Sequence, residues 1–304
     1  MKIFDTYIKL QESGYIKDFV GWFALSVCVL ALCLNIPILI ITIKKYIKTN
    51  DKKLIILITI SDIMLSLSVI VFQLVRSGTK FHIYLESHFY CQFEGLLLSG
   101  LVHTSLYSVS ILSLERYFLI VRKQQYNGRI WLFTILIASL ITWILSFNLF
   151  YFGEFELMPS AAYCLLSYNS GWLSKLSVFV FSLEGLLACS VLVFSYMCIM
   201  MTRIRQIQKI KEVSKKSEFN TIQKPVKSRV TMIKIIGVMM VYLACLFPTI
   251  ISFIYEVVTG RPKPLLLDVI SVCLISCTNL GNAVLVLILH KETRAVLFSL
   301  FKFD

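Results

Sequence analysis

The chain has 304 residues, of which 58% are hydrophobic and only 15% are charged, and its formal net charge is +13. Soluble domains carry about 25% charged residues, so this composition excludes an ordinary soluble domain. Seven long apolar stretches and their short connections use the whole length, which leaves no room for a separate soluble domain.

Each apolar stretch is long enough for one membrane crossing, since a bilayer needs about 20 apolar residues in helical form. We therefore predict an all-α membrane protein, a seven-transmembrane helix bundle. The chain divides into an N-terminal segment 1–19, a membrane domain 20–289 and a segment 290–304, which we expect to form a short amphipathic helix on the membrane. The predicted spans are Val20–Ile43, Leu54–Val75, Gly95–Leu114, Trp131–Phe152, Leu176–Met201, Ile235–Val258 and Leu265–Leu289.

The Lys and Arg residues are distributed unevenly between the two sides of this membrane domain. The segments 44–53, 115–130, 202–234 and 290–304 hold 22 of them, and the segments on the other side hold 8. Basic loops stay in the cytoplasm during insertion, so we expect an extracellular N-terminus and a cytoplasmic C-terminus. The positive charge then faces anionic lipid and a cytoplasmic partner, and it is no indication of nucleic-acid binding.

Seven of the nine cysteines fall within the predicted spans. The other two are Cys91, before the third span, and Cys164, in the second external connection. The extracellular side is oxidising, so we predict a disulfide between them that ties the loop across the third helix. The alternative is two free cysteines.

Four polar residues occur at similar depth in four different spans: Asn35, Asp62, Ser105 and Asn282. Their distances in sequence from the cytoplasmic ends place each of them roughly 10–16 Å deep, at 1.5 Å of rise per residue. An unpaired carboxylate inside a membrane is costly, so we expect these side chains to meet.

The chain resembles the rhodopsin-like (class A) G-protein-coupled receptors over about residues 20–303. No single residue is specific, but the ordered set is. This set consists of Asn35, Asp62 in Ile60-Ser61-Asp62, Cys91, Glu115-Arg116-Tyr117, Trp143, Cys164, Tyr196, Cys245-Leu246-Phe247-Pro248 and Asn282. The resemblance implies a plasma-membrane receptor that binds an extracellular ligand and activates a heterotrimeric G-protein.

The resemblance also implies roles for the residues of the switch. Glu115 would hold Arg116 in the resting state, and Arg116, in the Glu115-Arg116-Tyr117 sequence, would contact the G-protein in the open state. Tyr196 would pack toward Arg116 in that state. Pro248 interrupts the sixth helix, and the kink would act as a hinge.

In the resembled family the polar cluster holds a sodium ion. This implies Asp62 as a sodium ligand, supported by Ser105 and Asn282. The alternative is a water-bridged network without an ion. We expect no other cofactor.

Three positions depart from the family pattern. Leu246 replaces the usual tryptophan, Ala188 replaces a proline of the fifth span, and the sequence from Asn282 to Val286 lacks the usual proline and tyrosine. We therefore expect raised ligand-independent activity. The alternative is a receptor relative that does not signal.

The sequence narrows the ligand class. Amine receptors use an aspartate where this chain has Leu97, Leu98 and Ser99, and Leu265–Leu289 contains no lysine that could bind retinal covalently. A peptide, a lipid or another small molecule is left.

The candidate pocket residues are Glu94, Leu98 and Glu184, because an acid inside a membrane is a functional candidate. The two acids would suit a cationic ligand. Glu184 could instead hydrogen-bond to a neighbouring helix, and we expect His103 to be a core histidine.

Enzyme activity finds no support, since the sequence has no phosphate-binding loop and no metal-binding Cys/His spacing. A transporter or channel is the rival class. Transporters often show internal repeats, and the seven spans show none that we can find.

Overall fold

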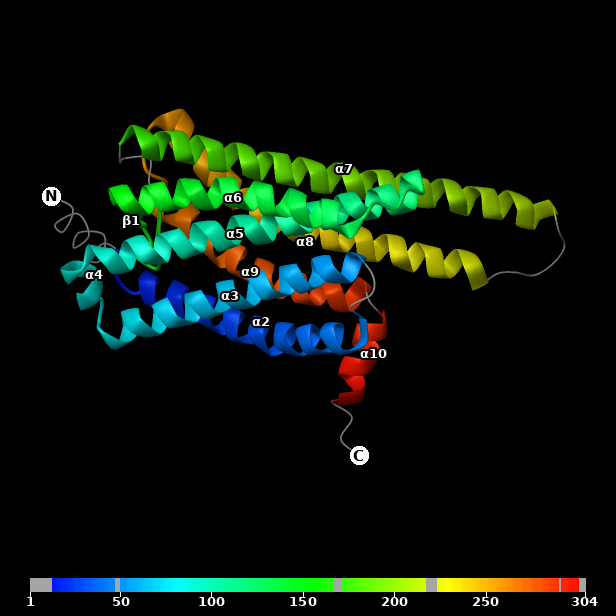
Figure 1. The fold of residues 1–304 in the computed structure, drawn as a ribbon, viewed down its shortest axis with the longest axis horizontal. Helices are drawn as coiled ribbons and strands as arrows, with labels where there is room; N and C mark the ends of the chain where they lie inside the picture. The colour runs from blue at the N-terminus through cyan, green and yellow to red at the C-terminus, as the bar shows by residue number, and fades with distance from the viewer. Residues whose placement is uncertain (1–12, 47–49, 167–170, 217–222, 290, 301–304) are drawn as a thin grey trace.

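The computed structural model describes residues 13–46, 50–166, 171–216, 223–289 and 291–300. It is a bundle of long helices that lie side by side (Figure 1). Within the described residues, seven helices are long and apolar enough to cross a membrane, one for each predicted span. This confirms the predicted all-α, seven-helix membrane fold. The long helices are α2 (Ile16–Tyr46), α3 (Asn50–Gly78), α5 (His88–Tyr117), α6 (Gly128–Phe152), α7 (Trp172–Lys216), α8 (Gln223–Thr259) and α9 (Leu265–Leu289).

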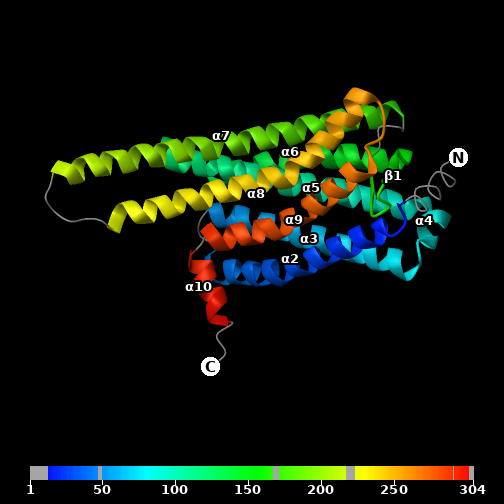
Figure 2. The same ribbon diagram turned by 180° about the vertical axis from the view of Figure 1, so that it is seen from behind.

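The two ends of the bundle carry different short elements. One end has α4 (His82–Glu86) and an antiparallel hairpin of β1 (Phe155–Leu157) and β2 (Cys164–Leu166). We call it the hairpin end. The other has the π-helix η1 (Phe118–Arg122) and α10 (Lys291–Leu300), and we call it the α10 end. Figure 2 shows α10 turned away from the bundle axis.

The helix boundaries differ from the predicted spans because helices continue beyond the apolar core of a membrane. Helix α2 begins at Ile16, inside the predicted N-terminal segment, and α5 begins at His88 rather than at Gly95. Helix α10 lies within the predicted C-terminal segment and contacts α2 and α9. Residues 1–12, 290 and 301–304 lie outside the described residues.

Helix α5 lies at the centre of the bundle, where it contacts α3, α6, α7 and both hairpin strands. Gly100 allows α6 to approach closely, since a Cβ at this position would lie 2.6 Å from the Trp143 ring. The Trp143 indole donates a hydrogen bond to Thr104 Oγ1 at 3.2 Å, which satisfies its N–H inside the bundle.

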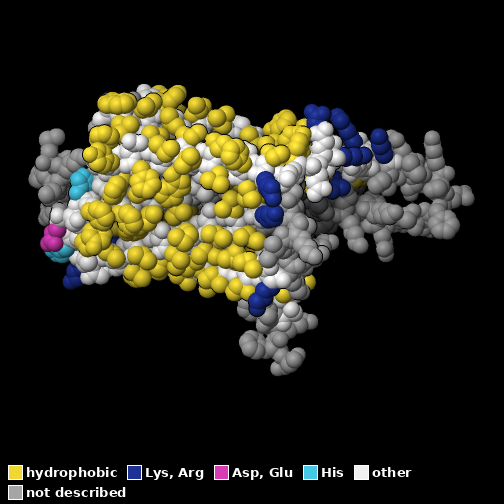
Figure 3. Space-filling model, viewed as in Figure 1, with side chains coloured by type: hydrophobic (Ala, Val, Ile, Leu, Met, Phe, Trp, Pro, Cys, Tyr) yellow, Lys and Arg dark blue, Asp and Glu magenta, His cyan; other side chains and the backbone are white. Residues whose placement is uncertain are grey.

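The side of the bundle is apolar, as a lipid-facing surface must be. Helix α6 exposes Phe133, Leu136, Leu140 and Ile144, a spacing of three and four residues that places them on one face. Figure 3 shows this apolar surface, with Lys and Arg gathered toward the α10 end.

Candidate functional site

The hairpin is fixed to α5 by covalent, polar and steric contacts. The predicted disulfide joins Cys91 to Cys164, whose Cα atoms are 5.3 Å apart. The Gln92 side chain donates to the Phe155 carbonyl at 2.6 Å and accepts from the Phe155 N–H at 3.0 Å. A Cβ on Gly95 would collide with the Phe155 ring, so glycine lets the strand lie against the helix.

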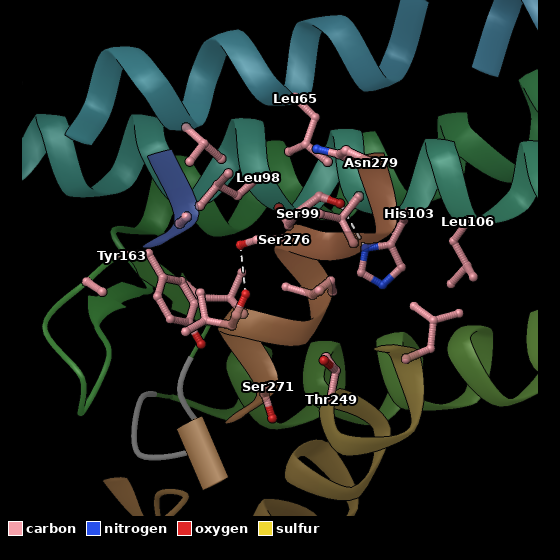
Figure 4. A pocket seen from close by; sticks show the side chains of 18 of the residues that line it. Leu65, Leu98, Ser99, His103, Leu106, Tyr163, Thr249, Ser271, Ser276 and Asn279 are labelled. Atoms are coloured by element: carbon pink, nitrogen blue, oxygen red, sulfur yellow. Dashed lines mark hydrogen bonds between the residues drawn. The ribbon is translucent and has the colours of Figure 1, made fainter. Parts of the chain in front are cut away.

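A cavity of about 120 Å³ is lined by the hairpin together with α2, α3, α5, α7, α8 and α9. Figure 4 shows side chains of these elements arranged around it. Its lining is mainly apolar and includes Leu65, the predicted Leu98, Phe181 and Ile250. A mostly apolar cavity with a few polar groups is typical of a small-molecule site.

Glu94 lines this cavity, but its carboxylate already forms an ion pair with a cationic side chain of the protein. Arg76 Nη2 donates to Glu94 Oε1 at 2.5 Å, and both side chains are only 2% exposed. Tyr84 Oη donates to Glu94 Oε2 at 3.1 Å, and the Cys164 N–H does so at 3.3 Å. Burial, with the Glu94 charge as a smaller cause, raises the pKa of Tyr84, so the phenol keeps the proton that it donates.

A second buried ion pair joins the α8–α9 connection to α9, and the hairpin turn hydrogen-bonds to it. Lys263 Nζ lies 3.0 Å from Asp268 Oδ1. Asp268 also accepts from Tyr163 Oη at 2.5 Å and from the Ser160 N–H at 2.9 Å. Burial raises the pKa of Tyr163, and the Asp268 charge raises it further. Lys263 and Tyr163 line the cavity, so this cluster closes its hairpin side.

Three residues of this site were not predicted from the sequence: Arg76, Lys263 and Asp268. The predicted second span ended at Val75, which left Arg76 in a loop, whereas α3 continues to Gly78. The sequence did contain a signal for the Arg76–Glu94 pair, since a cation follows the second span and an acid precedes the third.

Two further residues discussed from the sequence are Glu184, which is outside the described cavity lining, and His103, which belongs to it. Glu184 is absent from the described cavity lining and accepts from Thr142 Oγ1 on α6 at 3.2 Å, which is the neighbouring-helix alternative. His103 is buried, as expected, with Nδ1 2.8 Å from the Ser99 carbonyl oxygen. It also lines the cavity, where its ring lies tilted against Phe181, with 4.6 Å between the ring centroids.

Three of the four polar residues expected at one depth contact one another. Ser105 Oγ donates to Asp62 Oδ1 at 2.7 Å. Asn282 Nδ2 lies 3.1 Å from Asp62 Oδ1 and 2.9 Å from Oδ2. Asn35 bonds instead to the backbone of α9, with its Nδ2 3.5 Å from the Asn279 carbonyl oxygen.

The family model for the 7 transmembrane receptor (rhodopsin family) matches residues 34–284. This match covers most of the chain and includes the polar cluster, the disulfide and the cavity lining except for its three residues at the start of α2. The chain belongs to this receptor family. A comparison with curated proteins gives no match. Members of the family are multi-pass membrane receptors rather than enzymes.

The Glu115-Arg116-Tyr117 sequence lies at the α10 end of the receptor. Glu115 and Tyr117 are buried and Arg116 is half-buried. Tyr117 Oη accepts from Arg122 Nε at 3.1 Å, at the end of η1. Tyr196 on α7 is 4% exposed and packs in the same core cluster as Tyr117.

The residues at the positions that depart from the family pattern pack inside the bundle. Leu246 lines the cavity, and the Ala188 carbonyl accepts from Ser110 Oγ at 3.1 Å. Ala283 and Val286, in the segment that lacks the usual proline and tyrosine, are buried in the core. These positions therefore support the bundle by packing.

Proposed function

We propose that the protein is a plasma-membrane receptor that binds an external small molecule in the cavity and activates a heterotrimeric G-protein. The hairpin end would face outside, which agrees with the 8 basic residues predicted there against 22 on the other side. The observation that carries the proposal is the cavity closed by the disulfide-tied hairpin, in one bundle with the Glu115-Arg116-Tyr117 sequence.

Helix α8 would connect the two ends. Leu246 and Thr249 line the cavity on either side of Pro248. Proline lacks the N–H that would bond to the Ala244 carbonyl, so the helix is weakest there. A ligand that shifts this segment would move the α10-end half of α8 outward and expose Arg116 to the G-protein.

The polar cluster fits a sodium ion by its donor atoms. Asp62 supplies a carboxylate and Ser105 a hydroxyl, and Asn282 Oδ1 is buried without a hydrogen-bond partner among the described residues. Oxygen atoms are the ligands of hard cations. Asp62 would hold the ion, and Ser105 and Asn282 would support it.

The test of coupling is ligand-independent activation across a panel of Gα subtypes in cells, with Arg116→Ala as the paired variant. We expect a raised basal signal that the substitution abolishes at equal surface expression. The matched control is Arg129→Ala, which removes an exposed cation at the same end of the bundle. An absent signal from every subtype at normal surface expression would favour the relative that does not signal.

A transporter or channel is the second candidate, and the same cells test it. Uptake or current that depends on the receptor, with no response from any Gα subtype, would replace the proposed function.

A further inference from the structure

The polar atoms of the cavity indicate what kind of molecule it accepts, given the proposed function in which this cavity is the ligand site. Its lining is mainly apolar, and its volume of about 120 Å³ is close to that of an engineered cavity of about 150 Å³ that binds benzene. The body of the ligand is therefore apolar and of roughly that size.

Two nitrogens of Arg76 lack a hydrogen-bond partner among the described residues, although the guanidinium carbon lies 5.2 Å from the centre of the Tyr84 ring. Arg76 Nη2 is bonded to Glu94, whereas Nε and Nη1 are buried and have no partner among the described residues. The side chain is 2% exposed and lines the cavity. A buried donor without a partner is costly, and more so when it is charged, so a ligand that supplies an oxygen is favoured.

The charges of the lining argue against an ionic ligand. One acidic residue, Glu94, is present among the described lining residues. Its carboxylate already accepts hydrogen bonds from Arg76, Tyr84 and the Cys164 N–H. Lys263 is paired with Asp268 in the same way. Each pair is neutral, so an ammonium or a carboxylate would enter the cavity without a free counter-charge, and an unpaired buried charge is costly.

We propose that the cavity binds a small, uncharged, mainly apolar molecule whose carbonyl oxygen accepts a hydrogen bond from Arg76. This replaces the cationic ligand that the sequence alone favoured. A carbonyl uses the free N–H groups, adds no charge and leaves the pair with Glu94 intact.

The experiment compares probes of nearly equal shape on the purified full-length receptor in lipid nanodiscs. Acetophenone has the carbonyl, ethylbenzene lacks it, 1-phenylethylammonium carries a cation and benzoate an anion. Apparent dissociation constants come from the shift in Tm with probe concentration, after subtraction of empty nanodiscs. We expect acetophenone to bind at least about tenfold more tightly than ethylbenzene, because it accepts a hydrogen bond from a charged donor. Both ions should bind more weakly than acetophenone.

The double variant R76M/E94Q removes the donors without leaving a buried charge, and the amide that it introduces can still accept from Tyr84 and the Cys164 N–H. We expect the preference for acetophenone over ethylbenzene to disappear in it, while ethylbenzene keeps its affinity within about threefold. The matched control is Thr249→Val, which removes a lining hydroxyl that also has no partner among the described residues, and it should retain the preference. The preference is the ratio of two dissociation constants measured on the same variant. A general loss of stability affects both constants and therefore does not explain a loss of the preference.

Equal binding of acetophenone and ethylbenzene, tightest binding of either ion, or binding of none of the probes would overturn the proposal. A preference that survives in R76M/E94Q would overturn the role of Arg76. The binding assay contains no G-protein, so failure of coupling through Arg116 leaves it unchanged. Conversely, a basal signal lost in Arg116→Ala without carbonyl-selective binding would remove this inference alone.

Discussion

The receptor buries carboxylates in two different ways at two depths. At the hairpin end, Glu94 and Asp268 each contact a buried cation, Arg76 or Lys263, at 2.5 and 3.0 Å. In the middle of the bundle, the hydrogen bonds to Asp62 come from neutral groups on Ser105 and Asn282. The two acids at the hairpin end are each neutralised by a cation of the protein, whereas the described partners of Asp62 carry no charge.

The two kinds of carboxylate environment suggest different roles for the two regions. A buried ion pair is costly to break because either partner alone is an uncompensated charge. The hairpin end is therefore expected to remain closed and rigid. The Asp62 carboxylate is bound only by neutral donors among the described residues, so we propose that an ion binds there and that this part of the bundle changes with receptor state.

The largest expected effect comes from breaking one pair at the hairpin end. Glu94→Ala leaves the Arg76 guanidinium buried and unpaired, and we expect a loss of about 3–5 kcal/mol of stability. Thermal unfolding of the purified receptor measures it. The double variant R76M/E94Q is the control and should lose much less, since it buries no unpaired charge; equal losses in both would show that the pair is not the cause.

Removing the disulfide tests the covalent part of the same end. We expect Cys91→Ser with Cys164→Ser to cost about 2–4 kcal/mol, because the bond closes a long loop between α5 and β2. Thermal unfolding again gives the value. Cys33→Ser, at an exposed free cysteine, is the control, and a comparable loss there would argue against a special role of the bond.

A smaller effect is expected where the hairpin touches α5 through glycine. Gly95→Ala places a Cβ against the Phe155 ring, and we expect overpacking to cost about 1–3 kcal/mol. Gly281→Ala on α9 is the matched control, since a Cβ there meets no atom within 4 Å. Unfolding temperatures of the two variants decide the matter, and an unaffected Gly95→Ala would mean that the hairpin is free to shift.

The smallest effect on stability is expected in the polar cluster. Asp62→Asn keeps the shape of the side chain, so we expect a change of about 1 kcal/mol or less. The stabilisation of the receptor by sodium over potassium should vanish, because the negative charge is gone. Glu184→Gln, at a carboxylate outside the cluster, should retain the sodium effect. A receptor that is insensitive to sodium before substitution would favour the network without an ion.

The fold could be predicted from the sequence because hydropathy acts over whole segments. Seven apolar stretches can satisfy their backbone in a membrane only as helices, whatever their neighbours are. The disulfide could be predicted for a related reason, since Cys91 and Cys164 were the two cysteines outside the spans. Similar depth predicted the meeting of Asp62, Ser105 and Asn282, but it also included Asn35, which bonds to the backbone of α9 instead.

The candidate ligand site could be predicted only in part, because the direction of a side chain depends on how the helices pack: Glu94 and Leu98 line the cavity, and Glu184 is not among its described lining residues. The sequence treats Glu94 and Glu184 alike as intramembrane acids. The tertiary structure turns one into the cavity against Arg76 and the other toward Thr142 on α6. Sequence alone thus determined the membrane bundle and most of its polar core, whereas helix packing decided which charges cancel and which buried donors on Arg76 lack a partner among the described residues.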